Sequence, residues 1–434
     1  MINKYVLPIP VRFIDNKVFS NKVVDINLTH SEDFLLNTNW NAFDMKYEYL
    51  PYMATPQEIS YALACQNIAK GDCIDDSKTQ LENIRKYYKL WNNYIPAMEN
   101  NDDSLCEIKV KHIIDNSKKY HAISVETPAT KQIKVAVGNA RLSENDFIQA
   151  LKNKPNRSYK RYQQVSKLLH EALEEEVDIL VLPENFLPWE WLPDISRLCA
   201  NNQMALITGV EHILSSKNGL EPQKVYNLTA VILPYVKDSF KFSHVVYHHK
   251  VHYSPLEKRK IQGYRMEPFP GDQYQLFQWK DLWFSVYCCF ELASINDRSL
   301  FKSYADLTVA VEWNSDVIYF SNIIESLCRD LHCYCIQVNS SNYGDSRVIS
   351  PSKTELRDII KTKGGLNPTI LVDEINIDDL RDFQRKEYEL QKEDDRFKPT
   401  PPSFLTSVPE HKQNRTLWEH FDELTKIKEM SEID

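Results

Sequence analysis

The stretch RYQQVSKLLHEALEEEVDILVLPEN (Arg161–Asn185) contains the pattern that decides the fold. Its second half, DILVL (178–182), is a short continuous apolar run of the kind that forms a buried strand. Pro183 then stops the pairing and Glu184 follows it. The first half places its apolar side chains on one helical stripe, which consists of Tyr162, Val165, Leu168, Leu169, Ala172 and Leu173. The stretch therefore predicts a helix that leads into a buried strand.

The same alternation continues on both sides of this stretch. Longer amphipathic or polar segments separate seven further apolar runs. These runs are IKVAV (Ile133–Val137), MALITGV (Met204–Val210), LTAVIL (Leu228–Leu233), WFSVYC (Trp283–Cys288), LTVAV (Leu307–Val311), CYCIQV (Cys333–Val338) and TILVDEI (Thr369–Ile375). Strands that alternate with helices indicate a layered α/β architecture.

The composition excludes several classes of function. The chain has 434 residues, of which 42% are hydrophobic and 26% charged, as in an ordinary globular protein. Its formal net charge of −9 argues against a nucleic-acid partner, because phosphate binding relies on an excess of Lys and Arg. Only 9 glycines are present, without a GxGxxG or GxxxxGK[ST] pattern, so we expect no nucleotide cofactor and a small-molecule substrate.

The sequence predicts a cytoplasmic location. No uninterrupted apolar run reaches the roughly 18 residues of a membrane span. The opening MINKYVLPIPVRF carries an Arg and two prolines where a signal peptide needs a clean apolar stretch. The 9 cysteines are too sparse for a disulfide scaffold, so we expect reduced thiols.

Three regions follow from the pattern along the chain. Residues 1–131 form an accessory region with a helix near 56–70, for which Thr55 is the expected N-cap, and a second helix over 77–91. In this second helix, Ser77 and Gln80 form an expected capping box. Residues 132–405 hold the strand-rich domain, and residues 406–434 form a helical tail.

Three segments carry residues with catalytic chemistry. Glu184 follows a buried strand, and the carboxyl ends of strands are where α/β sheets bind ligands. YHHKVHYSPLE (247–257) supplies Lys250 and three histidines, but adjacent histidines have poor zinc-ligand spacing, so we expect no metal. WFSVYCCFELAS (283–294) supplies two adjacent thiols. Strand alternation predicts that Cys288 and Cys289 point to opposite faces, with at most one at a site.

Taken together and in this order, LVLPEN, HKVHYSPLE and YCCFEL resemble the signatures of the carbon–nitrogen hydrolase (nitrilase) superfamily. The resemblance runs from about Gln132 to Phe404 and includes ADLTVAVEWN (305–314) and SRVISPS (346–352). It departs from the family at Ser285, where a glycine is usual, and at PSKTE (351–355), where the family has P-x-G. These departures affect the shape of the pocket but remove no catalytic group.

The resemblance implies a four-layer α-β-β-α sandwich and a triad of Glu184, Lys250 and Cys289. The family nucleophile immediately precedes an aromatic residue, which selects Cys289 and assigns Cys288 to the core. Glu184 would accept the thiol proton, and Lys250 would stabilise the oxyanion. An ammonium about 4 Å away is worth up to about 4 kcal/mol at an effective dielectric of 20, so we expect Lys250 to make the thiolate accessible.

The resemblance also assigns four supporting residues. Glu257 matches a second family glutamate that orients the lysine or the substrate. The backbone N–H of Phe290 would assist at the oxyanion, while Trp313 and Asn314 would line the pocket. Domains of this family commonly pair, so the resemblance also implies a homo-oligomer.

The leading hypothesis is a hydrolase that cleaves a non-peptide carbon–nitrogen bond, most readily an amide, through a cysteine thioester. A nitrile hydrolase or an acyl transferase would use the same triad. A different class is a nitrilase-like sensor, regulatory or interaction module within a larger assembly, such as a defence or reverse-transcriptase-linked system. The third alternative, chance matches on an α/β domain, predicts that Glu184, Lys250 and Cys289 do not converge.

Overall fold

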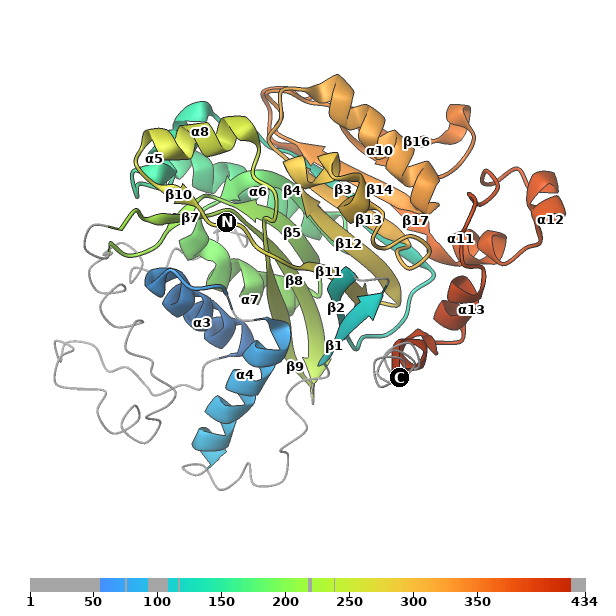
Figure 1. The fold of residues 1–434 in the computed structure, drawn as a ribbon, viewed down its shortest axis with the longest axis horizontal. Coiled ribbons are helices and arrows are strands. Elements are labelled where there is room, and N and C mark those ends of the chain that lie inside the picture. Colours follow the sequence, from blue (N-terminus) through green and yellow to red (C-terminus); the bar gives the residue numbers. More distant parts are fainter. Residues whose placement is uncertain are drawn as a thin grey trace, which may run out of the picture.

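The chain folds around two β-sheets that pack face to face (Figure 1). Residues 1–54 and 93–107 of the expected accessory region, and 423–434 of the expected tail, lie outside the described residues. Element labels follow Figure 1. The computed structural model describes residues 55–74, 76–92, 108–115, 118–217, 221–237 and 239–422.

The first sheet has six strands and contains the predicted strand of the opening stretch. Its three central strands β3, β4 and β5 run parallel, and antiparallel strands flank them on both sides. In spatial order the strands are β17 (Thr369–Asn376), β3 (Gln132–Asn139), β4 (Ile179–Leu187), β5 (Ala205–Val210), β8 (Leu228–Lys237) and β9 (Phe240–His249).

The second sheet has eight strands. Its central strands β12, β13 and β14 are parallel, and β11 forms a tight antiparallel hairpin with β12. In spatial order the strands are β1 (Ile108–Asp115), β2 (Lys118–Val125), β11 (Tyr274–Trp279), β12 (Leu282–Cys288), β13 (Leu307–Glu312), β14 (Tyr334–Asn339), β15 (Ser346–Ile349) and β16 (Asp358–Thr362). A small third sheet contains β10 (Glu267–Pro268), β7 (Lys224–Tyr226) and β6 (Ile213–Leu214).

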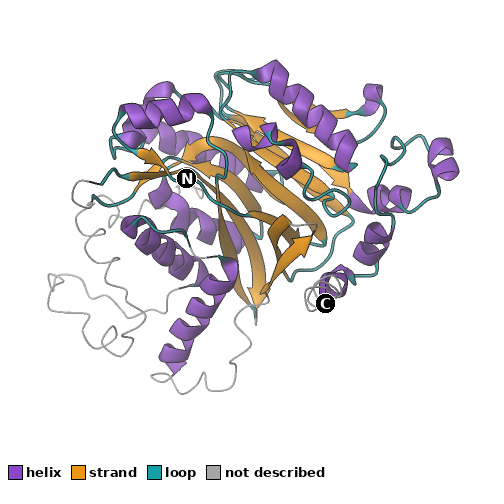
Figure 2. Ribbon diagram, viewed as in Figure 1, coloured by secondary structure: helices purple, strands orange, loops and turns teal. Residues whose placement is uncertain are grey.

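Helices cover the outer faces of both sheets (Figure 2). Short 3₁₀ turns occupy 189–191, 289–293 and 354–356. The α-helices are α3 (Pro56–Lys70), α4 (Ser77–Asn92), α5 (Glu144–Leu151), α6 (Tyr159–Glu174), α7 (Leu192–Asn202), α8 (Pro255–Gly263), α9 (Ile295–Arg298), α10 (Val317–Leu331), α11 (Ile377–Gln384), α12 (Tyr388–Glu393) and α13 (Ser407–Gln413).

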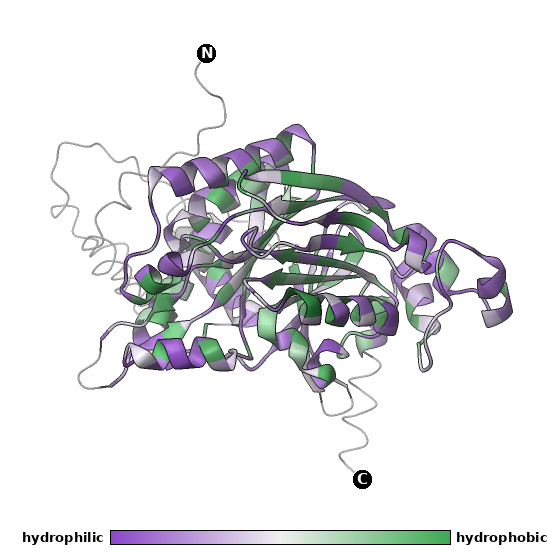
Figure 3. Cartoon of the chain, turned by 90° about the horizontal axis from the view of Figure 1, so that it is seen from above, coloured by the Kyte–Doolittle hydropathy of each residue, from purple (hydrophilic) through white to green (hydrophobic). Residues whose placement is uncertain are grey.

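The continuous apolar runs arise because the central strands are buried on both faces. In β4, Ile179 and Val181 belong to the core between the sheets, whereas Leu180 and Leu182 belong to the outer cluster that includes residues of α3, α6 and α7. Helix α10 covers the outer face of the second sheet. Hydrophobic segments accordingly concentrate on the strands in the middle of the molecule (Figure 3). The predicted four-layer α-β-β-α sandwich and all eight predicted strands are confirmed.

The two N-terminal helices are present where the sequence predicts them. Thr55 and Glu58 form a capping box at the start of α3. The expected cap of α4 is wrong by one residue, because the helix already begins at Ser77. The carboxylate of Asp76 accepts the Thr79 N–H at 2.9 Å and so caps this helix instead.

Segments on both sides of the predicted boundary at Gln132 contribute to the sandwich. Strands β1 and β2 pair with each other, and β2 joins the second sheet beside β11. Helix α3 lies against β9 of the first sheet (Figure 1). The second sheet therefore includes strands that precede residue 132.

A buried ion cluster attaches the C-terminal segments to the second sheet. Asp306 accepts from Arg381 Nη2 at 2.7 Å and from Lys412 Nζ at 2.6 Å. All three side chains are buried, and such charges are tolerated only when they are paired. Across the described part of the chain, no helix combines the length and apolar character that a membrane crossing requires.

We expect Leu168→Ala to lower the free energy of unfolding by about 3 kcal/mol, because Leu168 is fully buried between α6 and the first sheet. Urea denaturation measures the change. Gln163→Ala on the exposed side of the same helix is the control and should change stability by less than about 0.5 kcal/mol. Equal effects of the two substitutions would contradict the assignment of the buried face.

Candidate active site

A cavity of about 80 Å³ lies where the carboxyl ends of strands from both sheets meet. β4 and β9 of the first sheet lead into it, and so do β12 and β13 of the second. Its lining residues are Phe147, Glu184, Asn185, Lys250, Ser254, Leu256, Glu257, Lys260, Cys289 and Trp313.

Lys250 is the central charge of this cavity. It directly follows β9, and its ammonium donates to Glu184 Oε1 at 2.7 Å and to Glu257 Oε2 at 2.7 Å. Burial alone would lower the pKa of Lys250, but the two carboxylates raise this pKa well above its ordinary value. The side chain therefore remains an ammonium.

Glu184 is held by donors from three directions. Besides Lys250, Asn227 Nδ2 donates to its Oε1 at 2.8 Å, and the backbone N–H of Trp313 donates to its Oε2 at 3.1 Å. The chain can pass close to β5 here because Gly209 has no side chain, and a Cβ at Gly209 would lie 2.3 Å from Glu184 Cα. The carboxylate therefore has a fixed position between the two sheets.

Glu257 is the second carboxylate on Lys250. It lies in the first turn of α8, where it forms a capping box with Ser254. His212 Nε2 and Asn227 Nδ2 both contact its Oε1, at 2.9 Å and 2.8 Å. Burial would raise the pKa of Glu257, but Lys250 and His212 bring this pKa below its usual range. Glu257 is thus an ionised group that holds Lys250 together with Glu184.

The two cysteines do not follow the predicted strand alternation. Strand β12 ends at Cys288, and Cys289 begins a 3₁₀ turn with a left-handed backbone (φ 48°). This turn, rather than the pleat of a strand, brings Cys289 into the cavity. Cys288 is buried between the sheets with its Sγ 3.9 Å from Asn227 Oδ1, so it also lies near the site. The expectation of opposite faces is therefore wrong.

The thiol of Cys289 is not acidified in this arrangement. Burial raises its pKa most, Glu184 raises it further, and Lys250 lowers it only in part, so the pKa lies well above the ordinary value. The expectation that Lys250 makes the thiolate accessible is therefore wrong for this arrangement. A left-handed conformation at a non-glycine residue carries strain, and such strain is concentrated at functional sites. Cys289 is a strained neutral thiol beside a carboxylate.

Glu291 supports the turn that bears Cys289. Its carboxylate accepts the backbone N–H groups of Cys288 and Val251, both at 2.6 Å, and contacts His248 Nε2 at 2.9 Å. It therefore joins the strand end that carries Lys250 to the turn that carries Cys289. Glu291 belongs to the YCCFEL motif, but the sequence gives no sign of this role.

Asn227 and His212 are site residues that the sequence did not reveal. Asn227 directly precedes β8 and bridges Glu184 and Glu257, while its Oδ1 faces Cys288. A polar residue at the edge of an apolar run is the only local signal for Asn227. His212 carries no such signal, because its contact with Glu257 depends on the fold.

Of the seven predicted site residues, five line the cavity. Phe290 and Asn314 do not line it. Asn314 Oδ1 accepts the Asp316 N–H at 2.9 Å and so forms a local turn, and the Phe290 side chain packs against the outer core of the second sheet. The five are Glu184, Lys250, Glu257, Cys289 and Trp313.

Aromatic rings and a second lysine form one wall of the cavity. Phe147 and Trp313 have their ring centroids 5.6 Å apart. Lys260 Nζ lies 5.7 Å from the Phe147 ring centroid and 5.9 Å from that of Trp313. Lys260 also pairs with Glu144 at 2.6 Å. This wall is apolar with a cationic edge.

A family model for carbon-nitrogen hydrolases matches residues 147–384, which is more than half of the chain. The chain belongs to the carbon-nitrogen hydrolase family. It is therefore an enzyme of the carbon–nitrogen hydrolase class, and small-molecule substrates fit this class. No curated protein matches the sequence of this hydrolase.

Solved structures of the nitrilase superfamily are similar to this hydrolase. Saccharomyces cerevisiae Nit3, a member of branch 10 of the superfamily, has 16% identity and a TM-score of 0.43 over 60% of this chain and 96% of its own. A mutant amidase from Nesterenkonia sp. AN1 in complex with acrylamide has 14% identity and a TM-score of 0.39, covering 62% and 99%. XC1258 from Xanthomonas campestris has 13% identity and a TM-score of 0.40, covering 62% and 99%.

The His248–Glu291 pair predicts a pH-dependent contribution to stability. Burial alone would lower the pKa of His248, but Glu291 raises this pKa above its ordinary value of 6.5. The pair therefore stabilises the fold fully below about pH 6.5, and this contribution is lost as the pH rises through the raised pKa. We expect the stability lost in His248→Gln to be greater at pH 6 than at pH 9 by about 1 kcal/mol or more.

Denaturant unfolding at both pH values measures this difference. Gln163→Ala on the exposed side of α6 is the control, and its effect should be the same at the two pH values because no titrating group is removed. A loss in His248→Gln that is constant with pH, or greater at pH 9, would contradict the charged pair.

Proposed function

We propose that this enzyme hydrolyses the amide bond of a small molecule through a thioester on Cys289. One observation carries the proposal: a buried ammonium, Lys250, bridges two carboxylates at 2.7 Å in the same cavity as a strained thiol. Amide hydrolysis requires a nucleophile, a proton shuttle and positive charge at the developing oxyanion. Cys289 supplies the nucleophile, Glu184 the proton shuttle and Lys250 the positive charge.

In the first half of the cycle, Cys289 Sγ attacks the carbonyl carbon while its proton passes to Glu184. The raised pKa of the Cys289 thiol supports this role for Glu184, because a neutral thiol needs a base during attack. The carbonyl oxygen becomes an oxyanion beside the Lys250 ammonium and the backbone N–H of Phe290. Protonated Glu184 then gives its proton to the amide nitrogen, the C–N bond breaks and the amine leaves.

In the second half, water attacks the thioester carbon and gives a proton to Glu184. The second tetrahedral intermediate collapses, the C–S bond breaks and the proton returns to the Cys289 sulfur. A carboxylic acid leaves and the enzyme is restored. The donors on Glu184 from Asn227 and Trp313 support this double role, because they hold the carboxylate in one position throughout.

Glu257 holds Lys250 rather than transferring protons. Its lowered pKa and its contacts with His212 and Asn227 support this role, because an ionised carboxylate keeps the lysine charged. Trp313 is proposed to contact the substrate. Asn314 is proposed to act through the loop that positions Trp313, since its own side chain bonds within that loop.

The domain limits and the cellular setting are also proposals. Residues 132–405 would form the catalytic unit, residues 1–131 an accessory region and residues 406–434 a tail. The exposed Ile318 and Tyr319 on α10 support a homo-oligomer. The cysteines in the described residues are all free thiols, which supports a reducing cytoplasm.

We expect Cys289→Ala to abolish covalent labelling by an amide-mimicking electrophile such as fluoroacetamide, because the thiol that attacks is removed. Cys288→Ala is the matched control and should keep the adduct. Intact-mass spectrometry reads both variants. An adduct on Cys289→Ala that disappears in Cys288→Ala would reverse the assignment.

We expect Glu184→Gln to lower kcat by at least about 100-fold on any amide that the enzyme hydrolyses, because the amide side chain cannot accept the thiol proton. Released ammonia or amine measures the rate across a panel of small amides. Glu174→Gln at the exposed end of α6 is the control and should keep full activity.

The same panel, extended with nitriles, separates the alternatives. Transfer of the acyl group to an added amine would indicate an acyl transferase, and turnover of nitriles alone would indicate a nitrile hydrolase. An unmodified Cys289 with no turnover of amides or nitriles would favour a regulatory module and overturn the proposal.

A further inference from the structure

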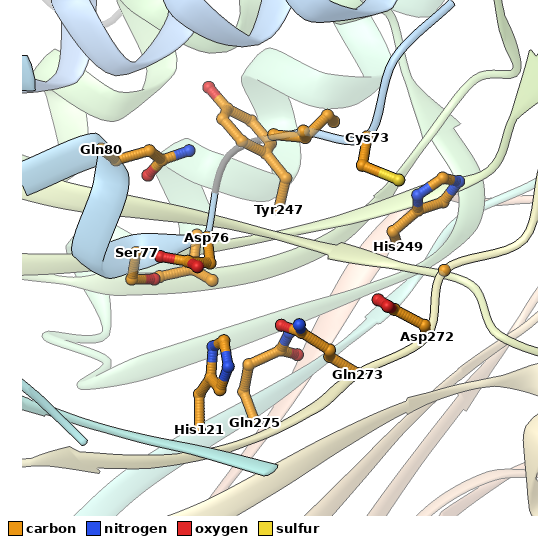
Figure 4. Close-up of a pocket in the computed structure, with 13 residues that line it drawn as sticks. Cys73, Asp76, Ser77, Gln80, His121, Tyr247, His249, Asp272, Gln273 and Gln275 are labelled. Carbon is orange, nitrogen blue, oxygen red and sulfur yellow. The ribbon is translucent and has the colours of Figure 1, made fainter. Parts of the chain in front are cut away.

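A second cavity of about 50 Å³ lies beside the segment that joins α3 to α4 (Figure 4). β2, β9 and β11 contribute the opposite walls. Its lining residues include Asp76, His121, His249, Asp272 and Gln275, and none of its lining residues lines the active-site cavity. The proposed hydrolysis makes no use of it.

The charge in this cavity is negative. Asp76 and Asp272 contribute two carboxylates. Burial lowers the pKa of both His121 and His249 to about 4, so both rings are neutral at pH 7. The nearby Lys224 ammonium donates to the Gly71 carbonyl at 2.5 Å, and Lys224 does not line the cavity. The cavity therefore favours a cation.

An unpartnered nitrogen points to a ligand that donates hydrogen bonds. His249 is about nine-tenths buried, and its Nε2 has no hydrogen-bond partner within the described residues. The His249 ring forms a hydrogen bond with the backbone of Phe269. This bond raises the pKa of His249, so the imidazole N–H donates and the backbone carbonyl accepts. Nε2 is then the accepting nitrogen of a neutral imidazole. A buried acceptor without a donor costs about 1–3 kcal/mol, and a bound donor removes this cost.

We propose that this cavity binds a primary ammonium group, either the ammonium ion or a short alkylammonium. The two carboxylates supply the opposite charge, and His249 Nε2 supplies an acceptor for one of the N–H donors. Among the described residues, no three His, Cys, Asp or Glu side chains are grouped closely enough to hold a metal ion. The volume of about 50 Å³ exceeds the roughly 10–15 Å³ that one water requires, so a head group with a short stem fits.

Hydrogen bonds connect this ammonium site to the catalytic turn. Gln275 Oε1 contacts His248 Nδ1 at 2.9 Å, and His248 Nε2 contacts Glu291, which accepts the Cys288 N–H. The Gly271 N–H, also at the cavity, donates to the Lys250 carbonyl at 3.0 Å. The role of this site rests on the proposed function. Amide hydrolysis releases an amine, which is protonated at neutral pH, and the site would sense this ammonium product.

Isothermal titration calorimetry on the full-length Cys289→Ala protein tests the site without turnover. We expect saturable binding of n-propylammonium chloride and none of tetramethylammonium chloride, which has the charge but no N–H donor. Asp76→Asn/Asp272→Asn should weaken n-propylammonium binding by at least about tenfold, because both charged acceptors are lost. Asn also caps helices, so α4 keeps its N-cap.

Asp373→Asn/Glu374→Gln is the matched control, since it removes two carboxylates from exposed positions on β17 and should leave the Kd unchanged. If the first double variant does not fold, Asp272→Asn alone, at an exposed position, should still weaken binding. Absent binding, equal binding of tetramethylammonium, or an unchanged Kd in the Asp76/Asp272 variants would overturn the site. Binding of n-propylammonium by this protein without amide turnover by the wild-type enzyme would keep the site and remove only its link to the product.

Discussion

The buried ammonium of Lys250 is the interaction on which the rest of the site depends. A charge in this position is tolerated only with close opposite charges, and two carboxylates provide them. These carboxylates come from β4 and α8, and they require further donors from Asn227, His212 and the backbone of Trp313. Removal of one partner would leave the others as buried, uncompensated charges. One nitrogen atom, Lys250 Nζ, therefore links α8, the end of β13 and the start of β8.

Much of the fold could be predicted from the sequence because its central strands are buried on both faces. Continuous apolar runs such as DILVL are unambiguous when they alternate with amphipathic helices. The edge strands β9 and β16 gave no such signal. β16 (Asp358–Thr362) has only five residues, of which Ile360 alone is buried, and β9 contains three histidines. Their pairing depends on neighbours that are distant in sequence.

The charged centre of the site could also be predicted, because Glu184 follows the apolar run of β4, while Lys250 and Cys289 directly follow β9 and β12. The geometry of the thiol could not, since left-handed backbone is expected at glycine or asparagine rather than at cysteine. The pKa of the Cys289 thiol depends on its burial and on the opposite effects of Glu184 and Lys250. The spacing of these residues along the chain does not reveal which effect is larger. Glu291 escaped notice because its role is to hold backbone N–H groups, and such partners appear only in three dimensions.

Glu184 and Cys289 belong to different sheets, and this has a consequence for partly folded forms of the enzyme. Each sheet with its helices has its own outer core, but the reacting groups meet only when the inner faces are in contact. Any opening between the layers would expose the two adjacent thiols of Cys288 and Cys289 while separating Cys289 from its base. A solvent-exposed cysteine pair without catalytic competence is vulnerable to oxidation. Close packing of the two inner faces therefore also protects the nucleophile from redox damage.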